Sequence, residues 1–131
     1  MLYRASISAS AVRLAEVDFI NKPPAGATRS MSESISIVIP AYNEGNAIGD
    51  TLSELKTMLS CNGIEAEIIV VDDGSSDDTS KVALQSGVRV LRHFSNRGYG
   101  AALKTGIPAA SNQIVAMTDA DGTYPFRYIP D

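Results

Sequence analysis

The stretch "EIIVVDDGSSDDT" (Glu67–Thr79) passes from a run of apolar, mostly β-branched residues directly into a cluster of carboxylates and hydroxyls. A run that is apolar on both faces is typical of a strand buried in a parallel sheet. Asp72 and Asp73 mark the carboxyl end of this strand, and the residues after them, 75–87, carry the capping pattern and the closing glycine of a helix. The stretch therefore predicts a strand, a tight turn and a helix in succession.

The same unit recurs on both sides of this stretch. Apolar strands alternate with helices at short spacing, and the first helix has an apolar stripe at helical intervals, formed by Ile48, Leu52, Leu55 and Leu59. This alternation predicts an α/β fold with a Rossmann-like, doubly wound and mainly parallel sheet. The other predicted elements are a strand over 34–40 that ends at Pro40, a helix over 44–60, a strand over 88–94, a helix over 98–107 that ends before Pro108, and a strand over 113–121.

Composition bounds the possible functions. Of the 131 residues, 44% are hydrophobic and 20% are charged, which is typical of one soluble globular domain. The formal net charge is −4, and the acidic excess lies after residue 30. Because nucleic-acid binding needs a basic surface, we expect no nucleic-acid partner. The single cysteine, Cys61, excludes an internal disulfide, and no apolar run reaches the roughly 20 residues that cross a bilayer.

The N-terminal segment differs in sequence pattern from the rest of the chain. Residues 1–30 end in a Pro-Pro-Ala-Gly linker signal. We expect them to form a weakly ordered extension ahead of a single domain over 31–131. Three interpretations of the extension stay open: a short helix with a linker, a targeting segment, and an upstream stretch that is not native sequence.

A second acidic cluster, "TDADG", follows the last predicted strand. Asp119 and Asp121 are two residues apart in extended chain, so their side chains leave on the same side, roughly 7 Å apart at Cα. Hard carboxylate oxygens without His or Cys nearby favour Mg²⁺ or Mn²⁺ over zinc. Two carboxylates do not fill an octahedral shell, so ligand oxygens would complete it, and a phosphate or diphosphate ligand is implied.

Ligands of doubly wound sheets bind beyond the carboxyl ends of the strands, where both acidic clusters fall. Asp72 and Asp73 would accept hydrogen bonds there, and a nucleoside offers donors on its base and ribose. Asp77 and Asp78 are expected instead to cap the helix that follows. Lys104, close to a glycine-rich turn, is a further candidate for a phosphate contact.

Four segments in order resemble the signatures of family-2 glycosyltransferases with the GT-A fold. They are "SIVIPAYNEGNAI", "VVDDGSSDDT", "NRGYGAALKTGI" and "TDADGTYP". The last two are most similar to the branch that moves a sugar from a nucleotide donor to a polyprenyl (dolichyl-type) phosphate, chemistry of polysaccharide and cell-envelope biosynthesis. The resemblance covers nearly all of the chain after Met31.

This resemblance implies roles for named residues. Asp119 and Asp121 would hold Mg²⁺ or Mn²⁺ on the donor diphosphate, with Asp121 as the catalytic candidate, and the metal would act as a Lewis acid on the leaving nucleoside diphosphate. Glu44 would lie near the ribose, and Asp72 or Asp73 would read the base. The nucleotide-binding residues are then Pro40, Ala41, Tyr42, Glu44, Asp72, Asp73, Lys104 and Asp119.

The resemblance also implies partners and a location. The donor would be a UDP- or GDP-sugar, and the acceptor a polyprenyl phosphate at a membrane, which places the protein in the cytoplasm or at the cytoplasmic membrane face. Thr123 stands where relatives often carry a glutamine, and the sequence stops at Asp131, soon after the acidic motif. We therefore expect the nucleotide-binding half of a GT-A fold, with an unpaired edge on its fourth strand that favours self-association.

Alternatives stay open at this point. "GYGAAL" (Gly98–Leu103) resembles part of a Rossmann dinucleotide motif, although Leu103 replaces the third glycine and the segment lies in the third crossover. A phosphate-receiver domain also gathers carboxylates at strand ends. A third alternative is a non-catalytic nucleotide-sugar-binding fragment that lacks the acceptor half. The lone His93 has no partner motif in sequence and is expected to be structural.

Overall fold

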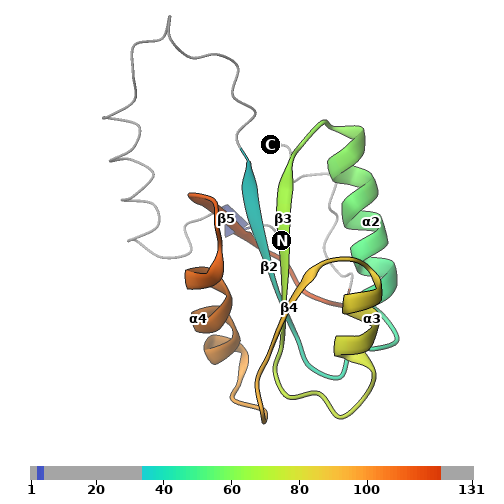
Figure 1. Cartoon of the computed structure of the whole chain (residues 1–131), viewed down its shortest axis with the longest axis vertical. Coiled ribbons are helices and arrows are strands. Elements are labelled where there is room, and N and C mark those ends of the chain that lie inside the picture. Colours follow the sequence, from blue (N-terminus) through green and yellow to red (C-terminus); the bar gives the residue numbers. More distant parts are fainter. Residues whose placement is uncertain (1–2, 5–33, 122–131) are drawn as a thin grey trace, which may run out of the picture.

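The computed structural model describes residues 3–4 and 34–121 (Figure 1). These residues form the predicted α/β fold, a mainly parallel sheet with helices on both faces. The strands are β1 (Tyr3–Arg4), β2 (Ile35–Ala41), β3 (Ala66–Asp72), β4 (Arg89–Arg92) and β5 (Ile114–Met117), and the helices are α2 (Ile48–Cys61), α3 (Thr79–Gln85) and α4 (Tyr99–Ala109).

The sheet has the strand order β1-β5-β2-β3-β4, and β2 to β5 are mutually parallel. Strand β2 pairs with β3 along its whole length, from Ile35 opposite Ala66 to Ala41 opposite Asp72. The carboxyl ends of the parallel strands lie together at the lower edge of the sheet in Figure 1. The loops that follow β2, β3 and β4 therefore meet at one end of the molecule.

Alternating strand residues form two cores, one on each face of the sheet. On one face, Ile37 and Ile39 pack with the apolar stripe of α2 and with α3. On the other face, Val38 and Val71 pack against α4. Because successive strand side chains point to opposite faces, a strand that is apolar throughout needs helices on both sides, which Figure 1 shows.

Several predicted helix ends are wrong, and α2 begins at Ile48 rather than at residue 44. Helix α3 begins at Thr79 rather than Ser75, and its N-cap residue, Asp78, makes no side-chain capping bond. Residues 75–78 form a loop instead, because their polar groups bond to other loops. Helix α4 continues through Pro108 to Ala109. Since Pro108 lies in the last turn, its missing N–H removes one helical bond without breaking the helix.

The predicted strand boundaries also need correction: β5 ends at Met117 rather than at residue 121, so Asp119 and Asp121 follow the strand and do not belong to it. Strand β2 includes Pro40, which lies opposite Val71, and ends one residue later. Strand β5 was expected to have an unpaired edge, and this is wrong at two positions, because Tyr3 pairs with Met117 and Arg4 with Ala116. Because β1 covers part of this edge, less of it is open to pair with a second chain.

Other expectations fall outside the described residues. They include the order of most of the 1–30 extension, the extent of the 31–131 domain and the departure at Thr123. Within residues 3–4 and 34–121, no helix combines the length and apolar character needed to cross a membrane.

Candidate functional site

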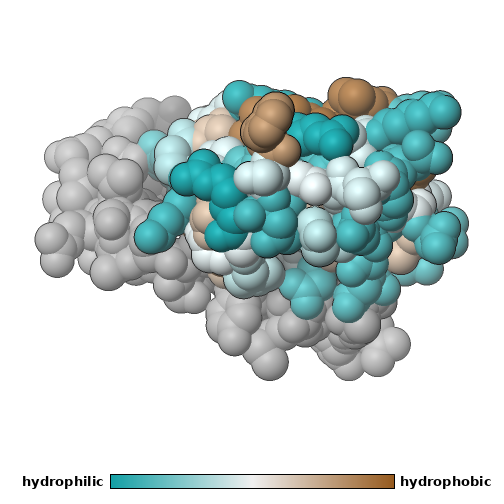
Figure 2. All heavy atoms as spheres, turned by 90° about the horizontal axis from the view of Figure 1, so that it is seen from below, coloured by the Kyte–Doolittle hydropathy of each residue, from teal (hydrophilic) through white to brown (hydrophobic). Residues whose placement is uncertain are grey.

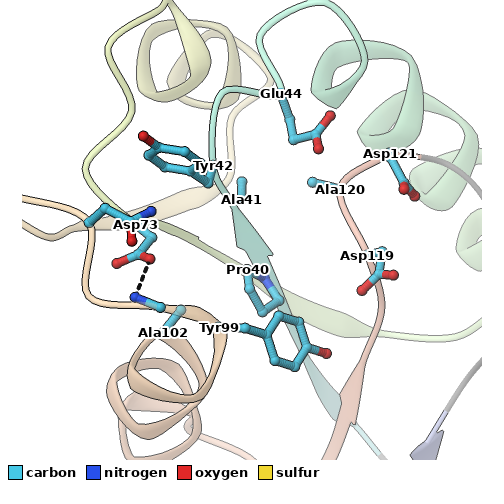
Figure 3. Close-up of a pocket in the computed structure, with 12 residues that line it drawn as sticks. Pro40, Ala41, Tyr42, Glu44, Asp73, Tyr99, Ala102, Asp119, Ala120 and Asp121 are labelled. Atoms are coloured by element: carbon cyan, nitrogen blue, oxygen red, sulfur yellow. Dashed lines mark hydrogen bonds between the residues drawn. The ribbon is translucent and has the colours of Figure 1, made fainter.

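A pocket of about 360 Å³ opens at the carboxyl ends of β2, β3 and β5, where the sequence predicts a ligand. Figure 3 shows Asp119 and Asp121 on one side, Asp73 on the other, and Pro40 of β2 between them. The lining residues are Pro40, Ala41, Tyr42, Glu44, Asp73, Asn96, Gly98, Tyr99, Ala102, Asp119, Ala120 and Asp121. Most of the predicted site residues are thus brought together, and the exceptions are Asp72 and Lys104.

One side of the pocket concentrates negative charge. Burial and the neighbouring Asp121 carboxylate raise the pKa of Asp119. Burial, followed by the charges of Asp121, Asp77 and Asp119, raises the pKa of Glu44. Burial is the larger cause for both groups, and repulsion between the carboxylates adds to it; a bound cation would relieve that repulsion.

The acidic side fits a divalent ion that is only partly held by protein. Asp119 and Asp121 offer hard oxygen ligands, which suit Mg²⁺ or Mn²⁺. Within the part of the chain that the structure describes, no group of three or more His, Cys, Asp or Glu side chains is arranged to hold a metal. With only these two carboxylates among the described residues, a metal at this pair would need further oxygens, for example from water or from a ligand such as a diphosphate.

Asp73, on the opposite side, is nearly buried and accepts three hydrogen bonds. Its Oδ1 accepts from Nδ1 of His93 at 2.6 Å and from the backbone N–H of Arg97 at 2.9 Å, and its Oδ2 accepts from the N–H of Gly98 at 2.8 Å (dashed in Figure 3). Burial alone would raise the pKa of Asp73, but the hydrogen bonds outweigh it and hold that pKa below its usual value. Asp73 is thus an ionised carboxylate that fixes the loop before α4.

The two predicted residues outside the pocket lie elsewhere for clear reasons. Asp72 is fully buried and accepts hydrogen bonds from the N–H of Ser75 at 2.8 Å and from the hydroxyl of Ser80. Arg92 approaches the same carboxylate at 3.9 Å. Asp72 therefore stabilises the loop between β3 and α3, and Lys104 is an exposed residue of α4 that does not line the pocket.

The loop after β2, which carries Tyr42 and Glu44, is bonded to the loop after β3. Asn43 donates its backbone N–H to Oγ of Ser75 at 2.9 Å, and its side-chain Oδ1 accepts from the N–H of Ser76 at 2.9 Å. Asn43 has a positive φ of 52°, a conformation that asparagine tolerates better than most residues. The serines of "DDGSSDDT" therefore position the neighbouring pocket loop.

Two further bonds join the same loops. The N–H of Glu44 donates to Oγ1 of Thr79 at 3.0 Å, and the N–H of Gly45 donates to Oδ2 of Asp77 at 2.9 Å. The Thr79 hydroxyl and backbone N–H, together with the Gly45 N–H, hold the pKa of Asp77 below its usual value. Asp77 does bond to the first residue of α3, as the capping prediction requires, but it also bridges to the loop after β2.

Sequence reasoning found one aromatic residue of the pocket, Tyr42, and missed the other, Tyr99. Tyr99, at the start of α4, lines the pocket with Asn96 and Gly98, and its side chain is 56% exposed; Tyr42, on the loop after β2, is 47% exposed. The signal for Tyr99 was its position between two glycines at the start of the predicted helix over 98–107. Figure 2 views this end of the molecule and shows mainly hydrophilic residues over the described surface, with hydrophobic ones along one edge.

Comparison with known proteins gives consistent matches. The family model described as "Glycosyl transferase family 2" matches residues 36–131. The dolichyl-phosphate hexose transferase of Haloferax volcanii is 35% identical over 98 residues, covering 75% of this chain and 41% of the relative. The human dolichyl-phosphate beta-glucosyltransferase is 36% identical over 109 residues, covering 74% of this chain and 34% of the relative.

Solved structures match the same region. Glucosyl-3-phosphoglycerate synthase from Mycobacterium tuberculosis matches with a TM-score of 0.64 and 33% identity, covering 75% of this chain and 38% of that one. A structure of that enzyme with Mn²⁺, UDP and glucosyl-3-phosphoglycerate matches with a TM-score of 0.59 and 34% identity, covering 67% and 33%. The chain spans about a third to two-fifths of the length of these relatives.

Proposed function

Since this chain belongs to glycosyl transferase family 2, we propose that its pocket binds a nucleotide-diphosphate sugar together with Mg²⁺ or Mn²⁺ at Asp119 and Asp121. Its fold is that of GT-A glycosyltransferase structures, as the sequence predicts. The reaction proposed is transfer of the sugar to an acceptor. The observation that carries the proposal is the arrangement of the pocket, with an acidic pair on one side and the ionised Asp73 with Tyr42 on the other.

The two sides of the pocket suit the two ends of such a donor. A nucleoside has hydrogen-bond donors for Asp73 and an aromatic base that can stack on an exposed ring such as Tyr42 or Tyr99. The diphosphate would then lie toward Asp119 and Asp121, where a cation is needed to offset like charges. Glu44, on the same side as this pair in Figure 3, is proposed to contact the ribose.

The chemistry follows from these positions. When bound, the divalent ion supplies Lewis-acid neutralisation of the charge that develops on the leaving nucleoside diphosphate. Asp119 and Asp121 hold the ion, and the loops that carry Tyr42 and Tyr99 orient the donor for attack, so alignment is the main contribution of the chain itself. A phosphate acceptor is already ionised near neutral pH, and such a reaction needs no general base.

The acceptor proposed is a polyprenyl phosphate, because relatives at 35% and 36% identity are dolichyl-phosphate sugar transferases. The protein would then act at the cytoplasmic face of a membrane. Incubating the chain with Mn²⁺, radiolabelled UDP-glucose or GDP-mannose, and dolichyl or undecaprenyl phosphate in detergent tests this directly. Label in the lipid phase is expected, and donor binding without transfer would identify a non-catalytic nucleotide-sugar-binding module instead.

The dinucleotide alternative has little support. Gly100 of the "GYGAAL" segment lies inside α4, in the third crossover, and the segment leaves the acidic pair without a role. The receiver-domain alternative does not account for the second acidic pair at β5 or for the loop after β2. Neither explains the pocket as well as a metal-bridged nucleotide sugar.

A further inference from the structure

His93 connects the pocket to the helix behind it. Its side chain is 6% exposed and follows directly after β4. One ring nitrogen, Nδ1, lies 2.6 Å from Oδ1 of Asp73, and the other, Nε2, lies 2.7 Å from Oγ1 of Thr105 on α4. The imidazole therefore bridges a pocket carboxylate and a helix side chain.

The chemistry of Asp73 determines the direction of the first bond. An ionised carboxylate only accepts hydrogen bonds, so Nδ1 of His93 must carry the proton and donate it. The other two donors to Asp73 are the backbone N–H groups of Arg97 and Gly98. His93 is thus the one side chain among the hydrogen-bond donors that the described structure gives to this carboxylate, and it holds the carboxylate from the side of β4.

The loop that Asp73 fixes forms one wall of the pocket. Asn96, Gly98 and Tyr99 all line it. The loop also packs tightly against the chain beneath, since a Cβ placed on Gly74 would lie 2.4 Å from the carbonyl carbon of Ser95. Because the Arg97 and Gly98 amides bond to the Asp73 carboxylate, rotation of that carboxylate would break both of its bonds to the pocket wall.

We propose that His93 is a positioning residue for donor binding, which acts by holding the Asp73 carboxylate and through it the pocket wall of residues 95–99. The identity of the ligand rests on the proposed function. The holding of Asp73 and the pocket wall by His93 applies to the ligand-free protein as well. His93 does not line the pocket, so its effect on the donor passes through Asp73.

Two substitutions separate the two bonds of the imidazole. An asparagine at 93 carries its amide nitrogen near the place of Nδ1 and keeps the donor to Asp73. A glutamine places its amide near Nε2, so it keeps the bond to Thr105 and loses the bond to Asp73. If His93 only joins β4 to α4, the glutamine variant should resemble the wild type more closely than the asparagine variant does. If His93 positions Asp73, the asparagine variant should resemble it more closely.

The first measurement is amide hydrogen exchange of Arg97 and Gly98 by NMR in the ligand-free chain, with core amides of β3 as the internal reference. In His93→Gln we expect these two amides to exchange about tenfold faster or more, and in His93→Asn to stay near the wild-type rate. Equal rates in the two variants, or faster exchange in His93→Asn than in His93→Gln, overturn the proposal.

The second measurement is UDP affinity with Mn²⁺ present. His93→Gln should bind UDP about tenfold more weakly, the loss expected for one hydrogen bond to a charged group, and His93→Asn within about twofold of wild type. An unchanged affinity in His93→Gln, despite faster exchange, overturns the role in donor binding. Wild-type protein that fails to bind UDP overturns the proposed function, while the exchange rates still decide whether His93 positions the loop.

A third variant covers the case in which His93→Gln does not fold. Thr105→Val removes the partner of Nε2 and leaves the bond between His93 and Asp73 in place. Slow exchange of Arg97 and Gly98 in both Thr105→Val and His93→Asn supports positioning through Asp73. Fast exchange in either variant contradicts it.

Discussion

Asp72 and Asp73 are consecutive residues at the end of β3, yet their carboxylates bind two different loops. Oδ1 of Asp72 accepts from the N–H of Ser75 at 2.8 Å, and Oδ2 of Asp73 accepts from the N–H of Gly98 at 2.8 Å. Successive side chains of extended backbone point in opposite directions, so one carboxylate stabilises the loop before α3 and the other the loop before α4. Asp72 and Asp73 therefore stabilise two different loops, and each effect can be tested by a separate substitution.

Asp72 is expected to contribute to stability and not to bind the ligand directly. Asp72→Ala leaves the buried N–H of Ser75 and the hydroxyl of Ser80 without their acceptor, which should lower the free energy of unfolding by about 2 kcal/mol or more. Urea denaturation measures this. Asp78→Ala is the matched control, because Asp78 is exposed and makes no capping bond, and it should change stability by less than about 0.5 kcal/mol. Equal losses in the two variants would refute this assignment.

Asp73 should make stability depend on pH in the acid range. Its pKa is lower in the folded protein than in the unfolded chain, so the unfolded chain binds more protons as the pH falls. The stabilisation is fully present above the usual Asp pKa and is lost as the pH falls through the folded value. Asp73→Asn should thus be less stable than wild type at neutral pH, and the difference should narrow toward about pH 2 in urea titrations. A difference in the free energy of unfolding between wild type and Asp73→Asn that stays constant with pH would argue against an ionised, hydrogen-bonded Asp73.

Gly106 allows α4 to lie close to the sheet. A Cβ at this position would lie 2.5 Å from Cγ1 of Val38 and 2.8 Å from Cγ2 of Val71, both fully buried. Gly106→Ala should therefore destabilise the fold by about 1–3 kcal/mol through overpacking. Gly100→Ala, in the same helix with no atom within 4 Å of its Cβ, should stabilise by about 0.5–1 kcal/mol. Thermal unfolding followed by circular dichroism compares the two, and the prediction fails unless their effects have opposite signs.

Asn43 should affect ligand affinity without touching the ligand. Its Oδ1 accepts from Ser76, and its φ of 52° is costly for most residues. Asn43→Ala should loosen the loop that carries Tyr42 and weaken UDP binding roughly fivefold, about 1 kcal/mol. Asn43→Asp keeps an acceptor oxygen and should retain most of the affinity in a calorimetric titration. An aspartate variant as weak as the alanine variant would show that the side-chain bond is not the cause.

Local sequence patterns predicted the sheet and its helices because burial on both faces leaves a clear signal. Ile37, Val38 and Ile39 could be assigned to a central strand from apolarity alone, and all three are fully buried. The start of α3 was misplaced because Ser75 bonds to Asn43, which is distant in sequence. The pairing of Tyr3 with Met117 likewise joins residues that are far apart in the sequence and has no local signal.

The site was predicted less completely than the fold. The sequence placed Asp72 and Asp73 at the correct strand end, but it could not decide which carboxylate faces the pocket, since this depends on where β3 stops and on the loops that surround it. Lys104 was assigned to a phosphate contact by its proximity to glycines, whereas it lies on an exposed part of α4. His93 had no sequence motif, because its partners Asp73 and Thr105 come from different elements.

The central claim is that Asp119 and Asp121 hold a divalent ion through which the pocket binds a nucleoside diphosphate. Calorimetric titration of the purified chain with UDP and with GDP, in Mn²⁺ and after chelation, tests it most directly. The account predicts binding of one nucleotide that weakens at least about tenfold on chelation and in Asp121→Ala, and that is unchanged in Asp78→Ala, an exposed aspartate outside the pocket. Binding of equal strength with and without Mn²⁺, or binding that survives in Asp121→Ala, would contradict it.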